Sequence, residues 1–269
     1  MKGRVLIVAG SDSGGGAGVQ ADIKAVTALG AFAATAITAL TAQNTLGVHG
    51  VMAVPTDFIR QQIAVVLDDI GADAIKTGML HDVPTIEAVC DEIAARAPGV
   101  PLVADPVMVA TSGDRLLAPG AIAALRSLLI PRATIITPNL PEAEVLTGMT
   151  IRDEQQMRAA AAMMMTLGVP AVLLKGGHLE GARVVDLLVT EAGIEAFVSA
   201  RIDTRHTHGT GCTLASAIAA GLAQGMSLRD SVVRARAYVR AAIAAAPGFG
   251  QGHGPLDHAV TFDPSRIPA

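Results

Sequence analysis

The stretch HTHGTGCT, residues 206–213, places two closely spaced glycines just before an alanine-rich run that is typical of a helix. Backbone N–H groups at a helix start, together with the helix dipole, bind anions, and glycines let the backbone approach phosphate oxygens closely. The stretch therefore predicts an anion-binding loop, with a loop that merely turns the chain as the alternative. Cys212 occupies the position where a phosphate-handling loop more often carries a carboxylate.

Three further stretches carry residue types that suit phosphate and metal chemistry. Asn139 and Glu142 lie three residues apart at a predicted helix start, which suits a Mg²⁺ ion held partly through water, although Glu142 could simply complement the helix dipole. Lys175 ends an apolar strand, and because lysine is rarely buried without a partner, we expect a phosphate or a carboxylate beside it. Asp105 ends another strand, where it either helps to order a metal or makes a local turn with Pro106.

The glycine-rich stretch GSDSGGGAG, residues 10–18, follows the first apolar run. It lacks the Gly-Lys-Ser/Thr ending of a Walker loop and does not match GxGxxG, so it could cover a small substrate or serve only packing. Cys90 is expected to pack in a helix core, and His206 and His208 lack the partners of a zinc site. His253 and His258 are expected at the surface or at a hinge.

The elements that must position these residues alternate along the chain. Buried strands are predicted at residues 4–10, 33–41, 72–80, 100–107, 133–139 and 169–178, with a hairpin at 183–202. Helices are predicted at 17–30, 56–71, 82–99, 119–131, 141–148, 153–168, 211–224 and 228–246. This alternation predicts one α/β domain over residues 1–269, with a central, mostly parallel sheet covered on both faces. Polar and glycine residues collect at the carboxyl ends of the strands, where such sheets bind ligands.

Composition excludes several other classes of protein. The 269 residues are 51% apolar but only 2% aromatic, and the net charge of −4 argues against a broad basic face for nucleic acid. No Asp, Glu, Lys or Arg occurs between residues 25 and 56, yet glycines and polar residues interrupt this stretch, so we expect no membrane span. Two cysteines and the absence of a secretory start predict a cytoplasmic protein.

Together these stretches resemble the hydroxymethylpyrimidine/phosphomethylpyrimidine kinases of thiamine biosynthesis. The resemblance extends from Val5 to about His258 and rests on GSDSGGGAGVQADIKA, ITALTAQNTLGV, KTGML, DPVM, TPNLPEAE, LLKGGHL, THGTGCTLASAIAA and GHGPLDH. It implies a ribokinase-like fold of three α/β/α layers, with ATP and Mg²⁺ as cofactors and a pyrimidine alcohol, then its monophosphate, as substrates. We also expect a homodimer.

The resemblance also implies a role for each site residue. Gln43 and Asp22 would contact the aminopyrimidine edge by hydrogen bonds. The pyrimidine pocket would be lined by Gly10, Ala17, Met79 and Val107. Asp105 and Glu142 would organise Mg²⁺, and Asn139 and Lys175 would face the nucleotide phosphates. The backbone amides of Gly209, Thr210, Gly211 and Cys212 would form the anion hole, with Cys212 facing the reacting group.

Cys212 suits an enzyme that phosphorylates two different acceptors. In the second step the acceptor is already an anion, which needs no base and would be repelled by a carboxylate at this position. A thiol is mostly neutral at pH 7, although a helix start can lower its pKa enough for it to accept a proton from the alcohol. The alternative is that Cys212 merely packs as a small side chain.

Two positions depart from the family, and two other functions compete. Ser13 replaces the usual proline of the first loop and is expected to make that loop more mobile, and Arg236 replaces a lysine that could contact an anion. A related kinase for pyridoxine or pyridoxal is the alternative function. A non-catalytic pyrimidine-binding regulator is a second alternative, which the joint presence of Asp105, Glu142, Lys175 and Cys212 disfavours.

Overall fold

A nine-stranded sheet forms the centre of the protein, in the order β3-β2-β1-β4-β5-β6-β7-β8-β9. The computed structural model describes residues 1–109, 113, 116–118 and 120–262. Neighbouring strands from β2 to β7 are parallel, whereas β3, β8 and β9 pair antiparallel. The strands are β1 Arg4–Asp12, β2 Phe32–Gln43, β3 Val48–Ala53, β4 Ala74–Thr77, β5 Leu102–Ala104, β6 Ile135–Ile136, β7 Ala171–Leu174, β8 Arg183–Thr190 and β9 Gly193–Ala200.

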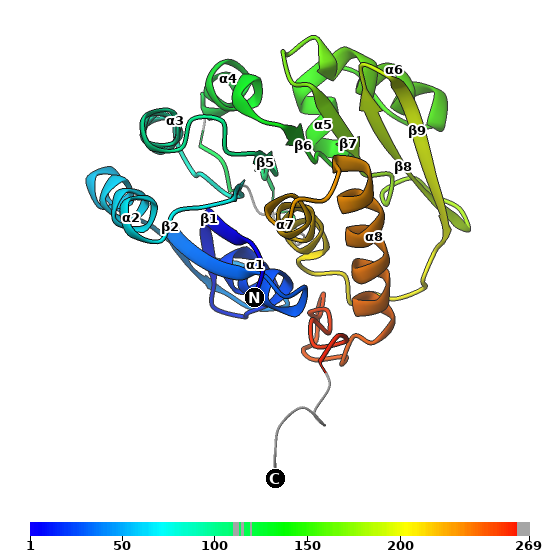
Figure 1. Ribbon diagram of the computed structural model, residues 1–269. Helices are drawn as coiled ribbons and strands as arrows, with labels where there is room; N and C mark the ends of the chain where they lie inside the picture. The colour runs from blue at the N-terminus through cyan, green and yellow to red at the C-terminus, as the bar shows by residue number, and fades with distance from the viewer. Residues whose placement is uncertain (110–112, 114–115, 119, 263–269) are drawn as a thin grey trace.

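Helices cover both faces of this sheet, as Figure 1 shows. One apolar cluster joins the sheet to α2 through α6, and a second joins the opposite face to α1, α7 and α8. The expected three-layer α/β/α architecture with a mostly parallel sheet is therefore confirmed. The helices are α1 Gly18–Ala28, α2 Thr56–Asp69, α3 Val83–Arg96, α4 Ala121–Ala124, α5 Leu140–Thr147, α6 Glu154–Met165, α7 Thr210–Ala223 and α8 Leu228–Ala244.

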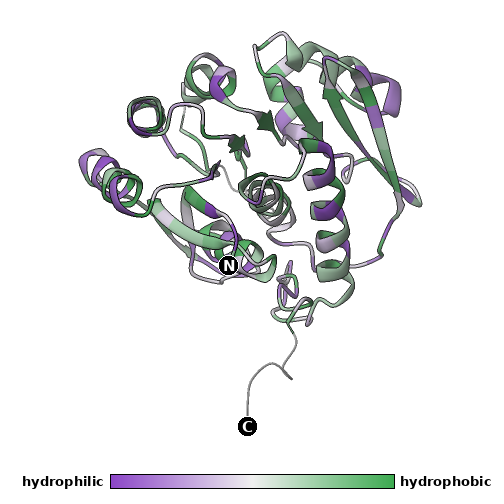
Figure 2. Cartoon of the chain, in the orientation of Figure 1, coloured by the Kyte–Doolittle hydropathy of each residue, from purple (hydrophilic) through white to green (hydrophobic). Residues whose placement is uncertain are grey.

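Burial on both faces explains why the central strands are apolar throughout. Val5 to Ala9 of β1 are each at most 1% exposed, and their side chains alternate between the two apolar clusters. Figure 2 shows the same distribution, with hydrophobic strands in the middle and hydrophilic residues on the helices outside. Cys90, in α3, packs in the core as expected.

Two elements differ from the sequence prediction. The antiparallel edge strand β3 was not predicted, because its exposed residues and Gly50 give no alternating pattern. The single helix predicted at 119–131 is instead a short α4 followed by a π-helical turn at Leu125–Leu129 and a 3₁₀ turn at Ile130–Arg132. Pro131 lacks an N–H group, so the helix cannot continue regularly past it.

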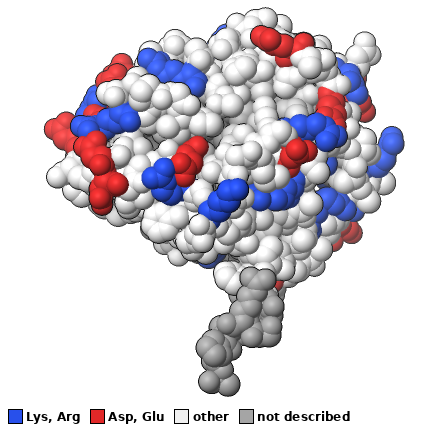
Figure 3. Space-filling view, viewed as in Figure 1, with Lys and Arg blue, Asp and Glu red and all other residues white. Residues whose placement is uncertain are grey.

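The outer surface gives two further results. Among the described residues, no helix combines the length and the apolar content that crossing a membrane requires. On the face of the described residues that Figure 3 shows, basic and acidic side chains alternate, and no broad basic area is visible.

Candidate active site

A cavity of about 730 Å³ opens where the carboxyl ends of the strands meet the start of α7. At one end it is lined by the first loop and by the ends of β2 and β4, and at the other by α8 and the β8–β9 hairpin. All but one of the site residues predicted above line it: Gly10, Ala17, Gln43, Met79, Asp105, Val107, Asn139, Glu142, Lys175, Gly209, Thr210, Gly211 and Cys212. The structure therefore brings these thirteen residues together around one cavity, and the roles assigned to them stay predictions.

The loop before α7 depends on glycine at two positions. Gly209 has a left-handed φ of 81°, and a Cβ there would collide with the carbonyl oxygen of Gly16 in the first loop. A Cβ at Gly211 would lie 3.0 Å from Nζ of Lys175 and 3.6 Å from a carboxylate oxygen of Asp105. The glycines thus allow the start of α7 to approach both the first loop and the ends of β5 and β7.

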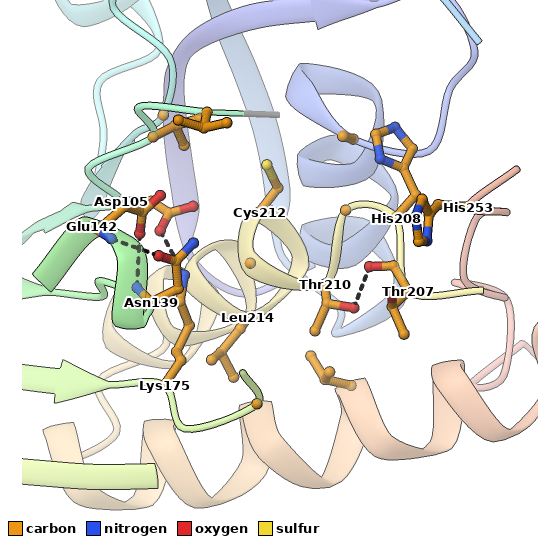
Figure 4. A pocket seen from close by; sticks show the side chains of 18 of the residues that line it. Asp105, Asn139, Glu142, Lys175, Thr207, His208, Thr210, Cys212, Leu214 and His253 are labelled. Atoms are coloured by element: carbon orange, nitrogen blue, oxygen red, sulfur yellow. Dashed lines mark hydrogen bonds and ion pairs between the residues drawn. The ribbon is translucent and has the colours of Figure 1, made fainter. Parts of the chain in front are cut away.

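Cys212 lies in the first turn of α7 and points into the cavity, between the Asp105–Lys175 group and His208 (Figure 4). Its sulfur also accepts the backbone N–H of Gly18 at the start of α1, so two helix N-termini converge on it. Burial nevertheless raises the pKa of the thiol to about 11, against the opposing effect of Lys76. The expectation that the helix start would lower this pKa is therefore wrong, because desolvation dominates, and the thiol is neutral at pH 7.

Asp22 is not positioned as predicted. It is fully buried in α1 and does not line the cavity, because both carboxylate oxygens bind Nζ of Lys76, at 2.8 and 2.9 Å. Ser216 of α7 donates a further hydrogen bond to it, at 2.7 Å. In this structure Asp22 therefore contacts Lys76 and Ser216 and does not reach the cavity. Asp22 instead balances the charge of Lys76, which is also 0% exposed and is one of the residues around the cavity.

Asp105 and Lys175 form the charged centre of the site. Lys175 Nζ lies 3.1 Å from Asp105 Oδ1, which also accepts a hydrogen bond of 2.9 Å from the hydroxyl of Thr137. Burial lowers the pKa of the Lys175 ammonium group, but the carboxylates of Asp105 and Glu142 outweigh it and raise that pKa overall. Lys175 therefore stays charged, with the carboxylate partner that was one of its two predicted neighbours.

Asn139 and Glu142 cap α5 reciprocally. The side-chain oxygen of Asn139 accepts the Glu142 N–H at 2.9 Å, and a Glu142 oxygen accepts the Asn139 N–H at 2.8 Å. Burial first, and then the charge of Asp105, raise the pKa of Glu142 to about 7 in spite of Lys175. Glu142 thus has the helix-start role that was the alternative to metal binding, and it also faces the charged centre.

The donor set fits a hydrated Mg²⁺ ion. Within the described ranges, no group of three or more His, Cys, Asp or Glu side chains could hold a metal unaided. Mg²⁺ commonly binds one or two carboxylates, several waters and substrate phosphates, which matches Asp105 and Glu142 beside the anion loop. Burial first, and then the negative charge of Asp105, raise the pKa of Glu142, and a divalent cation bound beside it would favour its ionised form.

The other end of the cavity combines apolar side chains, such as Met79 and Val107, with polar side chains that include Gln43. A Cβ at Gly10 would lie 3.1 Å from the sulfur of Met79, so the glycine leaves room for that side chain. The hydroxyl of Ser13 donates to the carbonyl oxygen of Gln43 at 2.9 Å and accepts its N–H at 2.8 Å. Ser13 therefore ties the first loop to β2, contrary to the expectation that it would make the loop more mobile.

Sequence reasoning missed two histidines. His208 is 7% exposed, and its Nε2 lies 2.9 Å from Oδ2 of Asp12, which no metal-spacing rule could reveal. His258, expected at the surface or a hinge, is 5% exposed and bonded to Thr213 Oγ1 at 2.9 Å. Burial lowers the pKa of His258 to about 4. For His208 and Asp12, the only signal in the sequence was that each is a polar residue within or next to a glycine-rich loop.

Arg236 lines the far end of the cavity, and its guanidinium group interacts with Asp186 and Phe197. Its Nε donates to Asp186 at 2.7 Å, and its guanidinium group lies 5.1 Å from the ring centre of Phe197. Asp186 also accepts the N–H of Gly176, next to Lys175. The departure from lysine thus supports the β7–β8 connection.

Comparisons with known proteins agree with this geometry. The phosphomethylpyrimidine kinase family model matches residues 12–257. A hydroxymethylpyrimidine/phosphomethylpyrimidine kinase of Streptomyces coelicolor is 49% identical, over 94% of this chain and 93% of its own length. A thiamine biosynthesis bifunctional protein of Geobacter sulfurreducens is 50% identical over 98% of this chain, which spans only 54% of that longer protein.

Solved structures of kinases share the fold. An ADP complex of Bacillus subtilis pyridoxal kinase superposes with a TM-score of 0.90 and 38% identity, covering 97% of this chain and 98% of that one. A phosphomethylpyrimidine kinase of Clostridium difficile gives a TM-score of 0.79 with 40% identity, covering 89% and 98%. The resemblance inferred from the sequence is confirmed, and the chain belongs to the phosphomethylpyrimidine kinase family of phosphotransferases.

Proposed function

We propose that this protein transfers a phosphoryl group from ATP to 4-amino-5-hydroxymethyl-2-methylpyrimidine, and then a second one to the resulting monophosphate, with Mg²⁺ as cofactor. One observation carries the proposal: a single cavity joins a small apolar pocket at Gln43 and Met79 to the charged centre at Asp105 and Lys175, with the start of α7 between them. A planar substrate at the first end would present its hydroxymethyl group to a nucleotide at the second.

The chain's own residues would act mainly by positioning and by charge stabilisation, as phosphoryl transfer requires. Lys175 would bind oxygens of the transferred phosphoryl group, and the backbone amides at the start of α7 would bind the charge that develops on it. Asn139 would face the nucleotide phosphates. Bound Mg²⁺ would neutralise phosphate charge, held by Asp105 and, through water, by Glu142, whose carboxylate already accepts backbone N–H groups.

The neutral thiol of Cys212 fits the second transfer best. The acceptor is then a phosphate monoester that carries about −1.5 to −2 charges at pH 7 and needs no base. A thiol with a pKa of about 11 adds no charge beside it. In the first transfer, Cys212 could accept the proton of the alcohol only while it is in its rare thiolate form. Orientation and the anion loop would therefore supply most of the rate.

A product mass spectrum tests the proposal directly. The protein is incubated with the pyrimidine alcohol, ATP and Mg²⁺, and the products are followed over time. Monophosphate should appear first and diphosphate later, with two ADP released per alcohol consumed. No ADP release with this alcohol would refute the proposal and would favour a non-catalytic pyrimidine-binding regulator.

Pyridoxal phosphorylation is a second candidate, favoured by the TM-score of 0.90 to a pyridoxal kinase. Side-by-side assays on both alcohols separate the two functions. The proposal expects a higher kcat/KM with the pyrimidine, and a second phosphorylation with the pyrimidine only.

We propose further that residues 1–269 are one kinase domain that acts as a homodimer in the cytoplasm. The single sheet supports one domain, and the exposed Leu46, Val51 and Met52 on and beside the edge strand β3 support self-association. Light scattering after size-exclusion chromatography should give about twice the 27.3 kDa of one chain. A mass of one chain would refute the dimer.

A further inference from the structure

Four polar side chains form a connected network at the substrate end of the cavity. His208 Nε2 lies 2.9 Å from Oδ2 of Asp12 and 3.3 Å from the side-chain amide of Gln43. The other end of that amide lies 3.1 Å from the hydroxyl of Thr41, which in turn lies 2.9 Å from the carbonyl oxygen of Ser11. Of this network, Asp12, Thr41, Gln43 and His208 all line the cavity.

Asp12 fixes which atom of His208 carries the proton. Its Oδ2 accepts the N–H groups of Gly16 and Ala17, at 3.1 and 2.8 Å, and its Oδ1 accepts that of Gly14. Burial raises the pKa of this carboxyl group, but the hydrogen bonds from His208 and from the backbone outweigh it, and the pKa is lowered. An ionised carboxylate only accepts hydrogen bonds, so Nε2 of His208 must be a donor.

That proton determines the orientation of the Gln43 amide. If the amide nitrogen stood 3.3 Å from His208 Nε2, two donors would face each other. Thr41 has one hydroxyl proton, which the carbonyl oxygen of Ser11 takes, so Thr41 offers Gln43 an acceptor. When the amide is turned by half a rotation, its nitrogen donates to Thr41, and its oxygen shares with Asp12 the single Nε2–H of His208, with Asp12 as the nearer acceptor.

We propose that His208 and Thr41 lock the Gln43 amide in this one orientation, and that the lock makes the site select an aminopyrimidine over the corresponding 4-oxo pyrimidine. The locked amide has one N–H and one oxygen lone pair left for the cavity, in a fixed order. An aminopyrimidine edge presents a ring-nitrogen acceptor beside an amino donor. The 4-oxo ring presents the reverse order, a ring N–H donor beside a carbonyl acceptor, which only the opposite amide orientation could bind. His208 and Thr41 are thus positioning residues that act through Gln43.

The substrate class in this inference rests on the proposed function, and the test separates the two. We would measure kcat/KM for 4-amino-5-hydroxymethyl-2-methylpyrimidine and for its 4-oxo analogue, in the wild type and in three variants. His208→Phe keeps a ring but removes the donor, His208→Gln keeps an N–H near the position of Nε2, and Thr41→Val removes the acceptor. KM for ATP is measured alongside.

The wild type should prefer the amino substrate strongly. His208→Phe and Thr41→Val should each lower the amino-to-oxo ratio about tenfold, the effect of one ordinary hydrogen bond, with KM for ATP unchanged. His208→Gln should keep the wild-type ratio. A merely structural role would reduce both substrates equally and leave the ratio unchanged.

Two results would overturn the inference in distinguishable ways. If the wild type phosphorylates the aminopyrimidine but the ratio is the same in all four proteins, the lock is wrong and the proposed function stands. If the wild type releases no ADP with the aminopyrimidine, the proposed function fails and this inference fails with it. Should His208→Phe not fold, Thr41→Val decides the question from the other end of the amide.

Discussion

Replacing Cys212 by Asp should affect the two phosphorylation steps differently. The neutral thiol becomes a carboxylate beside a group of charged side chains. In this group the charge of Asp22 neutralises that of Lys76, and Lys175 interacts with both Asp105 and Glu142. No cation of this group is left to neutralise the new charge. Two unit charges about 4 Å apart interact by about 4 kcal/mol at an effective dielectric near 20.

The expected loss is therefore large for one step only. If about 2.8 kcal/mol of repulsion acts on the monophosphate acceptor, the second step slows about a hundredfold. The alcohol is uncharged and an aspartate can accept its proton, so the first step should largely survive. Each step is assayed separately, starting from the alcohol or from the monophosphate.

Cys212→Ser is the matched control, because serine is neutral and of similar size. It should slow the first step slightly and the second step hardly at all, because the buried thiol is itself seldom ionised and the second acceptor needs no base. If Cys212→Asp slows both steps equally, the charge argument is refuted, and the position serves only to pack the first turn of α7.

Gln43→Ala should raise KM for the pyrimidine about tenfold or more, because the polar edge of the substrate loses its hydrogen bonds to the Gln43 amide, while KM for ATP stays near the wild-type value. An unchanged KM for the pyrimidine would show that Gln43 does not bind the substrate. Glu142→Gln should shift the Mg²⁺ titration of activity to higher concentration, and an unshifted titration would leave Glu142 as a helix cap only. Lys76→Met should cost about 3–5 kcal/mol of unfolding free energy in urea, because Asp22 stays buried without a counter-charge, and Asp22→Leu added to it should recover much of the loss. Burial lowers the pKa of His258 from 6.5 to about 4, so between these pH values the unfolded chain binds a proton at His258 that the folded chain does not. The free energy of unfolding should therefore fall by up to about 3 kcal/mol as the pH drops from 6.5 to 4. His258→Gln should remove that fall.

Local patterns in the sequence were sufficient to predict the central part of the sheet, whereas the roles of the site residues came from the family resemblance and stay predictions. Strands bounded by glycine and polar residues indicated which chain positions meet at the carboxyl edge, and this placed Asp105 and Lys175 together before any distance was known. Cys212 was predicted at a helix start, and the family resemblance placed it at the same site. The edge strand β3 escaped because its pairing with β2, rather than any pattern of its own, makes it a strand.

Side-chain partners far apart in the sequence could not be predicted. The family resemblance implied that Asp22 contacts the substrate, and nothing near Asp22 in the chain indicates that Lys76, 54 positions away, reaches both of its oxygens. His208 was considered only as a metal ligand, whereas its partner Asp12 lies 196 positions earlier. The high pKa of Cys212 likewise depends on burial, which opposes the helix-start effect that the sequence suggested.

The segment after α8, which includes His253 and Gly254, affects the order in which the protein folds during its synthesis. It touches both halves of the substrate end: the N–H of His253 donates to the Thr45 carbonyl oxygen at 2.9 Å, and the carbonyl oxygen of Gly254 accepts the N–H of His208 at 3.1 Å. This segment leaves the ribosome after every strand and helix of the sheet has been made. Domains tend to fold as units during synthesis. A nascent chain could therefore assemble its sheet while the loops around Gln43 and His208 still lack these contacts, and the pocket would be complete only after the segment that follows α8 has been made.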